Sequence, residues 1–135
     1  MRRPGRRPAS TNCCGTETRV SAAILILVTG LAVPALAGPF DGIYRPDEPW
    51  AESWDCVSVG SEGGALAIEG DIFKGVESQC RLTNPVPVTG MDAILHDAEC
   101  AGEGESYTYR MMLLRLPEGV AVIEDGFVSP LKSCP

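Results

Sequence analysis

Short apolar or alternating runs, separated by dense turn signals, dominate the chain from residue 38 onward. The runs have the length of strands and cover residues 43–45, 53–59, 65–69, 72–82, 93–100, 107–116 and 120–124, with Phe127-Val128 after them. Outside residues 21–37, no window carries an apolar stripe of helical period and helical length. The pattern therefore predicts an all-β domain.

The turn signals between these runs are specific enough to predict hairpins. Gly70 can adopt the positive φ that the first central position of a type II′ turn requires. Pro117 presets φ for the next turn, and Gly119 is predicted to take the left-handed position that returns the chain. The pair Asp125-Gly126 is typical of a type I′ turn. Asn84-Pro85 and Gly63-Gly64 mark further breaks between strands.

Repeated short strands with this spacing favour a small antiparallel meander barrel of about seven to eight strands, with a sandwich as the alternative. Closure into a barrel is preferred because it removes the unpaired edges of the sheet. One short helical turn is expected near residues 48–53.

The stretch 21–37, SAAILILVTGLAVPALA, has the features of a secretory signal peptide. Its apolar core, residues 22–33, is shorter than the roughly 20 residues that a membrane-spanning helix needs. The small-residue triplet Ala35-Leu36-Ala37 predicts cleavage before Gly38, and a retained signal anchor is the alternative. We therefore expect a signal peptide at 1–37, a single all-β domain at 38–135, and a periplasmic or secreted protein.

Four cysteines fall in residues 38–135, and an even number in a small exported domain indicates two disulfides. Three pairings are possible, and we favour Cys80–Cys100 with Cys56–Cys134. The first would join one hairpin, and the second would tie an early segment to the C-terminal end. Each is worth roughly 3–4.5 kcal/mol by loop entropy. A zinc site is disfavoured because no C-x-x-C or Cys/His spacing is present.

Acidic residues outnumber basic ones strongly in the predicted domain. Residues 38–135 hold six Lys and Arg against 17 Asp and Glu, a formal charge of −11. Nucleic-acid binding needs a basic footprint and is excluded on this ground. An anionic membrane surface would also repel the cleaved domain. A basic protein is the expected partner if the charge serves binding, and solubility is the alternative reason for the charge.

No catalytic set, metal site or cofactor motif is predicted. His96 is the only histidine, the cysteines are expected in disulfides, and no G-x-S-x-G elbow is present. The acids around residues 92–105 lack the D-x-D-x-D-G order of a calcium loop. They are Asp92, Asp97, Glu99, Glu103 and Glu105.

Four residues are candidates for binding, each with a structural alternative. Trp50 lies in a proline-flanked segment and is either a contact aromatic or core cover. Trp54, two residues before Cys56, is expected to share its strand face and to pack beside the disulfide. Tyr107 shares one face of its strand with Tyr109. Arg110 lies in an apolar strand, either in an ion pair or in contact with an anion.

Two blocks of the sequence resemble small exported bacterial proteins of unassigned function. The blocks are DGIYRP with WDCVSVGSEGG, at residues 41–46 and 54–64, and GVESQCRLTNPV…GMDAILHDAEC…GEG, at residues 75–104. At the level of architecture, a cysteine-linked β-barrel of this size is also similar to the bacterial periplasmic inhibitors of c-type lysozyme. The resemblance implies a two-disulfide, all-β fold and supplies no catalytic residue.

The leading functional hypothesis is a soluble, exported, non-catalytic binding module, in its concrete form an inhibitor of a basic hydrolase. The first alternative is a small-ligand carrier that uses the barrel interior or mouth. It predicts a cavity well above about 300 Å³, lined by candidates Trp54, Tyr107, Met111 and Met112. An enzyme is the least favoured alternative.

Overall fold

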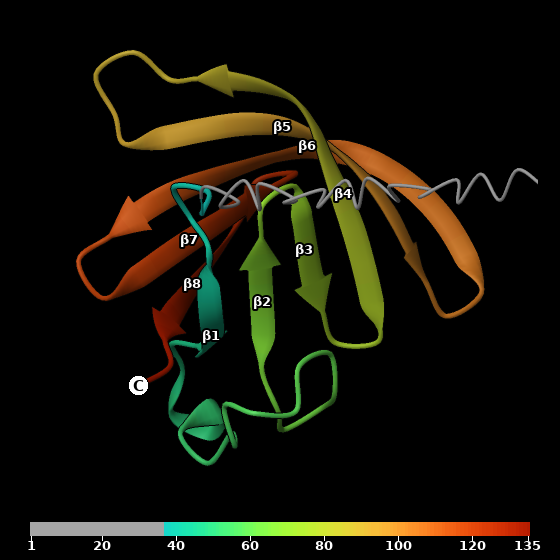
Figure 1. Cartoon of the computed structure of the whole chain (residues 1–135), viewed down its shortest axis with the longest axis vertical. Coiled ribbons are helices and arrows are strands. Elements are labelled where there is room, and N and C mark those ends of the chain that lie inside the picture. The colour runs from blue at the N-terminus through green and yellow to red at the C-terminus, as the bar shows by residue number, and fades with distance from the viewer. Residues whose placement is uncertain (1–36) are drawn as a thin grey trace, which may run out of the picture. The chain divides into compact units, whose positions relative to one another are not determined.

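Eight antiparallel strands follow one another in sequence order around a closed barrel (Figure 1). The computed structural model describes residues 37–135, so the predicted signal peptide, apart from Ala37, lies outside the described residues. The elements are β1 (Gly42–Pro46), the 3-10 helix η1 (Pro49–Ala51), β2 (Leu66–Glu69), β3 (Ile72–Gly75), β4 (Ser78–Pro87), β5 (Ala93–Gly102), β6 (Glu105–Leu116), β7 (Gly119–Glu124) and β8 (Phe127–Ser133). The predicted all-β meander barrel is confirmed, with eight strands.

The first and last strands pair with each other and close the sheet. Tyr44 lies opposite Ser133 and Pro46 lies opposite Leu131, in antiparallel register. Each of the remaining strands pairs with the strands before and after it in the sequence. Closure therefore leaves no unpaired edge strand in the barrel.

Alternate residues of the strands point into the barrel and form its core. On β6, Met111 is fully buried and Leu113 is 1% exposed, whereas Arg110 is exposed. Directly opposite residues of paired strands share a face, so the same alternation continues around the barrel. The buried cluster comprises Phe40, Tyr44, Leu66, Ile68, Cys80, Leu82, Ala98, Cys100, Met111, Leu113, Val120, Val122 and Leu131.

One end of the barrel, which we call the base, is closed by the residues that precede β1. Phe40 is buried, and its carbonyl accepts a 2.6 Å hydrogen bond from the buried hydroxyl of Tyr44. The guanidinium carbon of Arg115 lies 4.9 Å from the centre of the Phe40 ring. Asp41 Oδ1 accepts a 2.8 Å hydrogen bond from the backbone N–H of Gly70, in the β2–β3 turn. Together these contacts hold the incoming chain against the base.

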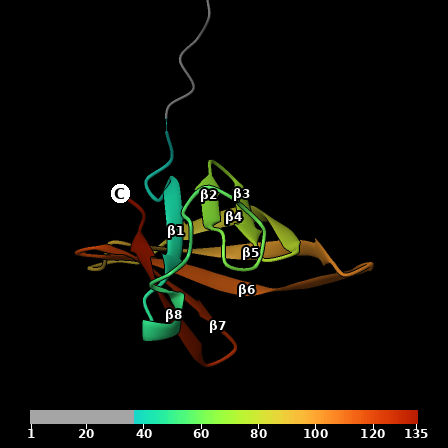
Figure 2. The ribbon, with the colours of Figure 1, turned by 90° about the horizontal axis from the view of Figure 1, so that it is seen from below.

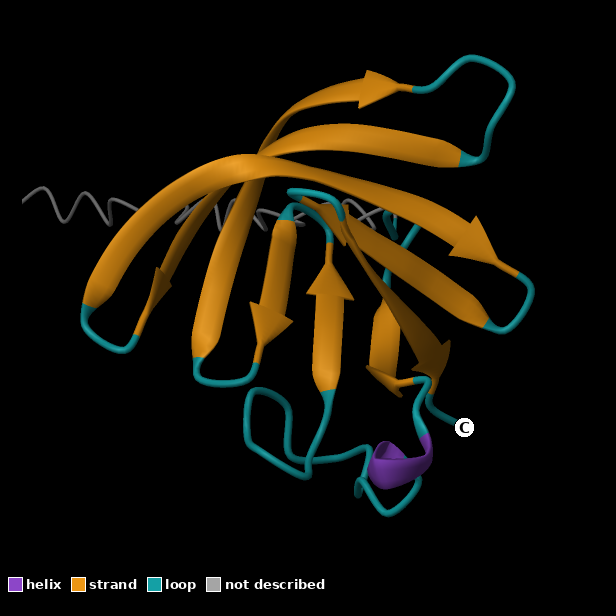
Figure 3. Cartoon of the chain, turned by 180° about the vertical axis from the view of Figure 1, so that it is seen from behind, coloured by secondary structure: helices purple, strands orange, loops and turns teal. Residues whose placement is uncertain are grey.

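The opposite end, which we call the mouth, carries the long connection between β1 and β2 (Figure 3). This connection begins with η1, which confirms the helical turn predicted near residues 48–53. Seen from below, the connection runs past β1 and places η1 beside β8 (Figure 2). The β3–β4, β5–β6 and β7–β8 turns lie at this same end, because each strand reverses direction relative to the one before.

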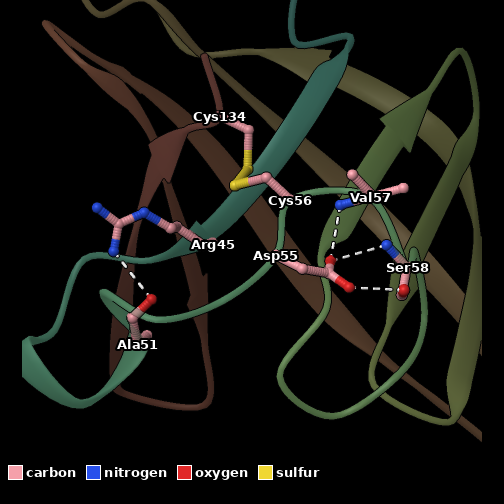
Figure 4. Close-up of a disulfide and its surroundings, with 7 residues drawn as sticks. All are labelled: Arg45, Ala51, Asp55, Cys56, Val57, Ser58 and Cys134. Carbon is pink, nitrogen blue, oxygen red and sulfur yellow. Dashed lines mark hydrogen bonds between the residues drawn. A yellow bond between two sulfur atoms is a disulfide. The ribbon is translucent and has the colours of Figure 1, made fainter.

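The strand predicted at 53–59 is wrong: this segment is a loop whose one ladder contact is an isolated bridge between Val59 and Ala65. Asp55 turns the chain here. Its Oδ1 accepts hydrogen bonds from the backbone N–H groups of Val57 and Ser58, at 2.7 and 2.9 Å (Figure 4). These side-chain bonds offer the backbone an alternative to a strand ladder. Val57, in this loop, is 78% exposed.

The single strand predicted at 72–82 is in fact two, because a tight turn at Val76 and Glu77 separates β3 from β4. Glu77 adopts a φ of 51°, and its backbone N–H donates to the carbonyl of Gly60. The converse error occurs at Asn84, which we predicted as a break between strands. Asn84 lies within β4, in a bulge with φ 48°, and its side-chain amide donates to Asp97 Oδ2 at 2.8 Å.

Most of the predicted turns are confirmed by their backbone geometry, with one correction. Gly70 has φ 61°, and Asp125 and Gly126 both have positive φ, as a type I′ turn requires. Gly119 does not adopt the predicted left-handed conformation. A Cβ at this position would collide with the backbone carbonyl of Leu131, so glycine is needed there for close strand approach.

Both disulfides have the pairing that we favoured from the sequence. Cys80 and Cys100 lie directly opposite each other on β4 and β5, with a Cα–Cα distance of 3.9 Å. Cys56 and Cys134 lie 78 positions apart and join the β1–β2 connection to the chain end beyond β8 (Figure 4). Cys56 lies in the loop with φ 57°, so the predicted strand face shared with Trp54 does not exist.

Candidate functional site

A pocket of about 700 Å³ opens at the mouth of the barrel. It is lined by the mouth ends of β1, β3, β4, β6, β7 and β8, together with η1 and the first residue of β2. Its lining comprises Pro46, Glu48, Trp50, Leu66, Phe73, Ser78, Cys80, Tyr107, Tyr109, Val122, Glu124, Val128, Ser129, Pro130 and Leu131. Aromatic and aliphatic side chains therefore form most of the wall, and the charged members are two glutamates.

Two tyrosines of β6 form one wall of this pocket. Tyr107 and Tyr109 point to the same side of the strand and stack with ring centres 6.0 Å apart, in nearly parallel planes. Tyr107 lies opposite Cys100, next to the Cys80–Cys100 disulfide. Tyr107 is 45% exposed, so its ring is available to a bound molecule.

The second aromatic wall comes from the β1–β2 connection. Trp50, in η1, is 64% exposed and lines the pocket, and its ring meets that of Trp54 edge-on at 5.9 Å. Pro49 starts the helical turn, where its fixed φ suits the first position. Arg45 donates a 2.9 Å hydrogen bond to the carbonyl of Ala51, which is fully buried (Figure 4). The turn that carries Trp50 is thus fastened to β1.

Glu124 is the charged residue of β7 that lies on the core face of its strand. It follows Val120 and Val122 in the alternation of β7, and both of these valines are buried core residues. Glu124 is half-buried and lies beside the Tyr109 hydroxyl. Burial, together with the nearby Glu124 carboxylate, raises the pKa of Tyr109, so its phenol stays protonated.

Apolar side chains continue from the pocket onto its rim. Phe127 and Val128, at the β7–β8 turn, are 73% and 62% exposed. The nearby backbone N–H of Asp47 donates a 2.9 Å hydrogen bond to the carbonyl of Pro130, which brings the start of the β1–β2 connection against β8. The rim is therefore built from two segments that are far apart in the sequence.

The structure brings two of the four predicted binding residues to this pocket, Trp50 and Tyr107. Trp54 instead packs against the core from the loop. Arg110 points away from the interior and forms an ion pair with Asp97, at 3.0 Å between Nε and Oδ1. Both partners are substantially exposed. Of the two alternatives for Arg110, the structure therefore shows the ion pair.

The lining predicted for a carrier needs correction at the methionines. Met111 is fully buried in the core, and Met112, its neighbour on β6, points to the opposite side. The barrel interior next to the base is filled by such residues, so the open space lies at the mouth. Phe73 and Glu124 were missed by the sequence reasoning. The alternation of β7 contains the signal for Glu124, because the spacing Val120, Val122, Glu124 places an acid on the core face.

His96 and the acidic group around residues 92–105 lie outside this pocket. His96 is directly opposite Met111, and burial lowers the pKa of its imidazole. Within residues 37–135, no group of three or more His, Cys, Asp and Glu side chains is arranged to hold a metal ion. The same residues contain no helix with the length and apolarity needed to cross a membrane.

Comparisons with known proteins show no family for this chain. No family model and no solved structure matches it. A segment of 52 residues is 40% identical to the V-type proton ATPase subunit S1 of Drosophila melanogaster. The match covers 37% of the chain and 14% of that subunit.

Proposed function

We propose that this protein is an exported, non-catalytic binding protein that holds a small, partly apolar molecule in the mouth of its barrel. The pocket carries the proposal. Its volume of about 700 Å³ lies within the roughly 300–1,000 Å³ of ordinary ligand sites, and its wall combines aromatic and aliphatic side chains with polar groups in similar measure. We therefore prefer the small-ligand carrier, an alternative in the sequence analysis, to the inhibitor of a basic hydrolase.

The composition of the lining supports binding rather than catalysis. Ser78 and Ser129 are the hydroxyl-bearing aliphatic residues of the wall, and Cys80 is held in a disulfide. A serine nucleophile is usually activated by a histidine or lysine within hydrogen-bond reach. The histidine and lysines of residues 37–135 do not line the pocket.

Titration with N-phenyl-1-naphthylamine, an uncharged apolar dye, tests the proposal. The oxidised protein should bind one dye molecule with a rise in dye fluorescence. Tyr107→Ala should weaken this binding about tenfold or more, whereas Thr108→Ala, on the opposite face of the same strand, should leave it unchanged. Absence of saturable binding, or equal binding by both variants, would remove the proposal.

Export is the second part of the proposal. The two disulfides are of a kind that persists in oxidising compartments, and the predicted leader would direct the chain there. The intact mass of the protein, with and without reduction, tests both points. We expect a chain that begins at Gly38 with its four cysteines oxidised. A full-length product with free thiols would contradict export.

A basic hydrolase is the alternative partner, favoured by the charge of −11 on residues 38–135 and by the exposed apolar rim at Phe127 and Val128. Complementary charge would steer such a partner to the domain. Incubation with a basic lysozyme at low salt tests this candidate. Failure of both binding and inhibition would remove it and would leave the small-ligand proposal unaffected.

A further inference from the structure

The charges of the mouth pocket point to one class of ligand. Glu48 and Glu124 are the charged residues of its lining, and no lysine, arginine or histidine among residues 37–135 joins them there. The four ion pairs formed within these residues involve neither glutamate. An anionic ligand would therefore meet two carboxylates and no compensating cation.

The position of Glu124 makes a purely apolar ligand a weaker match than a cation. This side chain is half-buried and lies on the core face of β7, two residues after the buried Val122. Removing a carboxylate from water is costly unless it is hydrogen-bonded and paired with a positive charge. The neighbouring Tyr109 hydroxyl is neutral and supplies no charge. A bound cation would supply the missing charge.

The aromatic walls favour the same ligand. Trp50, Phe73, Tyr107 and Tyr109 surround the space, and ammonium groups are attracted to the faces of such rings. Leu66, Val122 and Leu131 add aliphatic side chains to the lining, each less than a tenth exposed. The pocket thus offers a carboxylate and aromatic rings to a positive head and aliphatic side chains to a hydrocarbon tail.

We infer that the pocket binds an organic cation, with an ammonium head near Glu124 and the tyrosine rings and an apolar tail against Leu66, Val122 and Leu131. The inference rests on the proposed function, because it assigns the chemistry of the same pocket. It extends that function by excluding carboxylate and phosphate ligands.

Three probes of similar size and different charge test the inference: 4-phenylbutyl-trimethylammonium, 5-phenyl-1-pentanol and 5-phenylpentanoate. Calorimetric titration of the oxidised protein at pH 7 and low salt should give the cation about tenfold higher affinity than the alcohol, which corresponds to about 1.4 kcal/mol. The carboxylate should bind most weakly. Raising the salt concentration should weaken the cation alone, since a Coulombic contribution is screened.

Variants then locate the effect. Glu124→Gln should lower the affinity for the cation about tenfold and leave the alcohol unchanged. Glu62→Gln, which removes the same charge from an exposed position outside the pocket, should alter neither. Tyr107→Leu should lower the affinity for the cation, whereas Tyr107→Phe, which keeps the aromatic ring, should leave this affinity unchanged.

The outcomes separate this inference from the proposal beneath it. If the alcohol binds as tightly as the cation or more tightly, and neither Glu124→Gln nor salt changes the binding, the inference of a cationic ligand is wrong. The pocket would then bind neutral ligands. Binding of none of the three probes or the apolar dye would overturn the pocket itself. Tyr107→Leu, compared with Tyr107→Phe, keeps the inference testable even where Glu124→Gln folds poorly.

Discussion

The base and the mouth of the barrel are built from the same strands but differ in how completely those strands are covered. On the inner face of β6, Tyr107 is 45% exposed at the mouth, whereas Met111 is fully buried and Leu113 is 1% exposed toward the base. β7 changes in the same way, from the buried Val120 to the half-buried Glu124. Near the mouth, the aliphatic core residues give way to a tyrosine on β6 and to an acid on β7.

This difference separates the residues that stabilise the barrel from those available to a ligand. At the base, Phe40 closes the interior, and the Tyr44 hydroxyl and Arg115 guanidinium contact it. At the mouth, no equivalent side chain of residues 37–135 fills the space, and a pocket of about 700 Å³ remains. We therefore expect substitutions at the base to change stability and substitutions at the mouth to change binding.

Removal of the Cys56–Cys134 disulfide should have the largest effect and should disturb both ends together. The bridge joins the connection that carries Trp50 to the chain end beside β1. A closed loop of 78 residues is worth about 4.5 kcal/mol in the chain-entropy description. Urea unfolding of the Cys56→Ser/Cys134→Ser protein should show a loss of that order. The Cys80→Ser/Cys100→Ser protein, with a separation of 20, should lose less, about 3 kcal/mol. The reverse order would contradict the entropy argument.

Leu113→Ala and Tyr107→Ala compare the two ends directly on one strand. Truncation of the buried Leu113 should lower the free energy of unfolding by about 3 kcal/mol, because it leaves a cavity in a packed core. Truncation of the half-exposed Tyr107 should cost less than about 1 kcal/mol and should weaken dye binding. Urea unfolding and dye titration of both variants measure the contrast. Equal losses of stability would show that the mouth is as well packed as the base.

Tyr44→Phe probes the closure of the base by a single hydrogen bond. The substitution removes the donor to the Phe40 carbonyl and leaves this acceptor unpaired in a buried position. We expect a loss of about 1 kcal/mol, measured by urea unfolding. Tyr109→Phe is the matched change at the mouth. It should cost less, because Tyr109 is only partly buried, whereas Tyr44 is buried. An equal or larger cost at Tyr109 would contradict this account.

His96 should produce the smallest effect, visible only as a dependence on pH. Burial lowers the pKa of its imidazole below the ordinary value of 6.5, so the unfolded chain binds the proton more readily. Its contribution to stability is therefore complete above about pH 6.5 and declines as the pH falls toward the folded-state pKa. His96→Gln should reduce the pH dependence of the unfolding free energy between about pH 6.5 and 5. Asp55 and Glu118 have lowered pKa values and affect the stability below this range. An unchanged slope would show that His96 is as solvated folded as unfolded.

The errors at residues 53–59 and 72–82 have one physical origin. In both segments the apolar alternation is that of a strand, but hydrogen bonds outside the strand ladder hold the backbone where the ladder ends or is missing. Asp55 binds the N–H groups that follow it, and Glu77 donates its N–H to the carbonyl of Gly60. The second contact joins segments that lie far apart in the sequence, and alternation within one window contains no information about it.

The alternation of apolar residues and the turn pairs were sufficient to predict an all-β barrel, most of its strands and several of its hairpins. The even cysteine count and their positions were sufficient to favour the disulfides that the structure contains. These properties depend on neighbours in the chain, on the period of a strand and on the φ angles of short turns. They are therefore readable from the sequence alone.

Which end of the barrel stays open was decided only by the tertiary structure. The pocket contains residues from four separate elements: Trp50, Phe73, Tyr107 and Glu124. Strand register brings the residues of β3, β6 and β7 together at the mouth, and the β1–β2 connection adds Trp50. The sequence identified Trp50 and Tyr107 as candidates but held no information on their distance. Register and closure arise from contacts between distant strands, and these contacts place the aromatic rings beside a carboxylate on the core face.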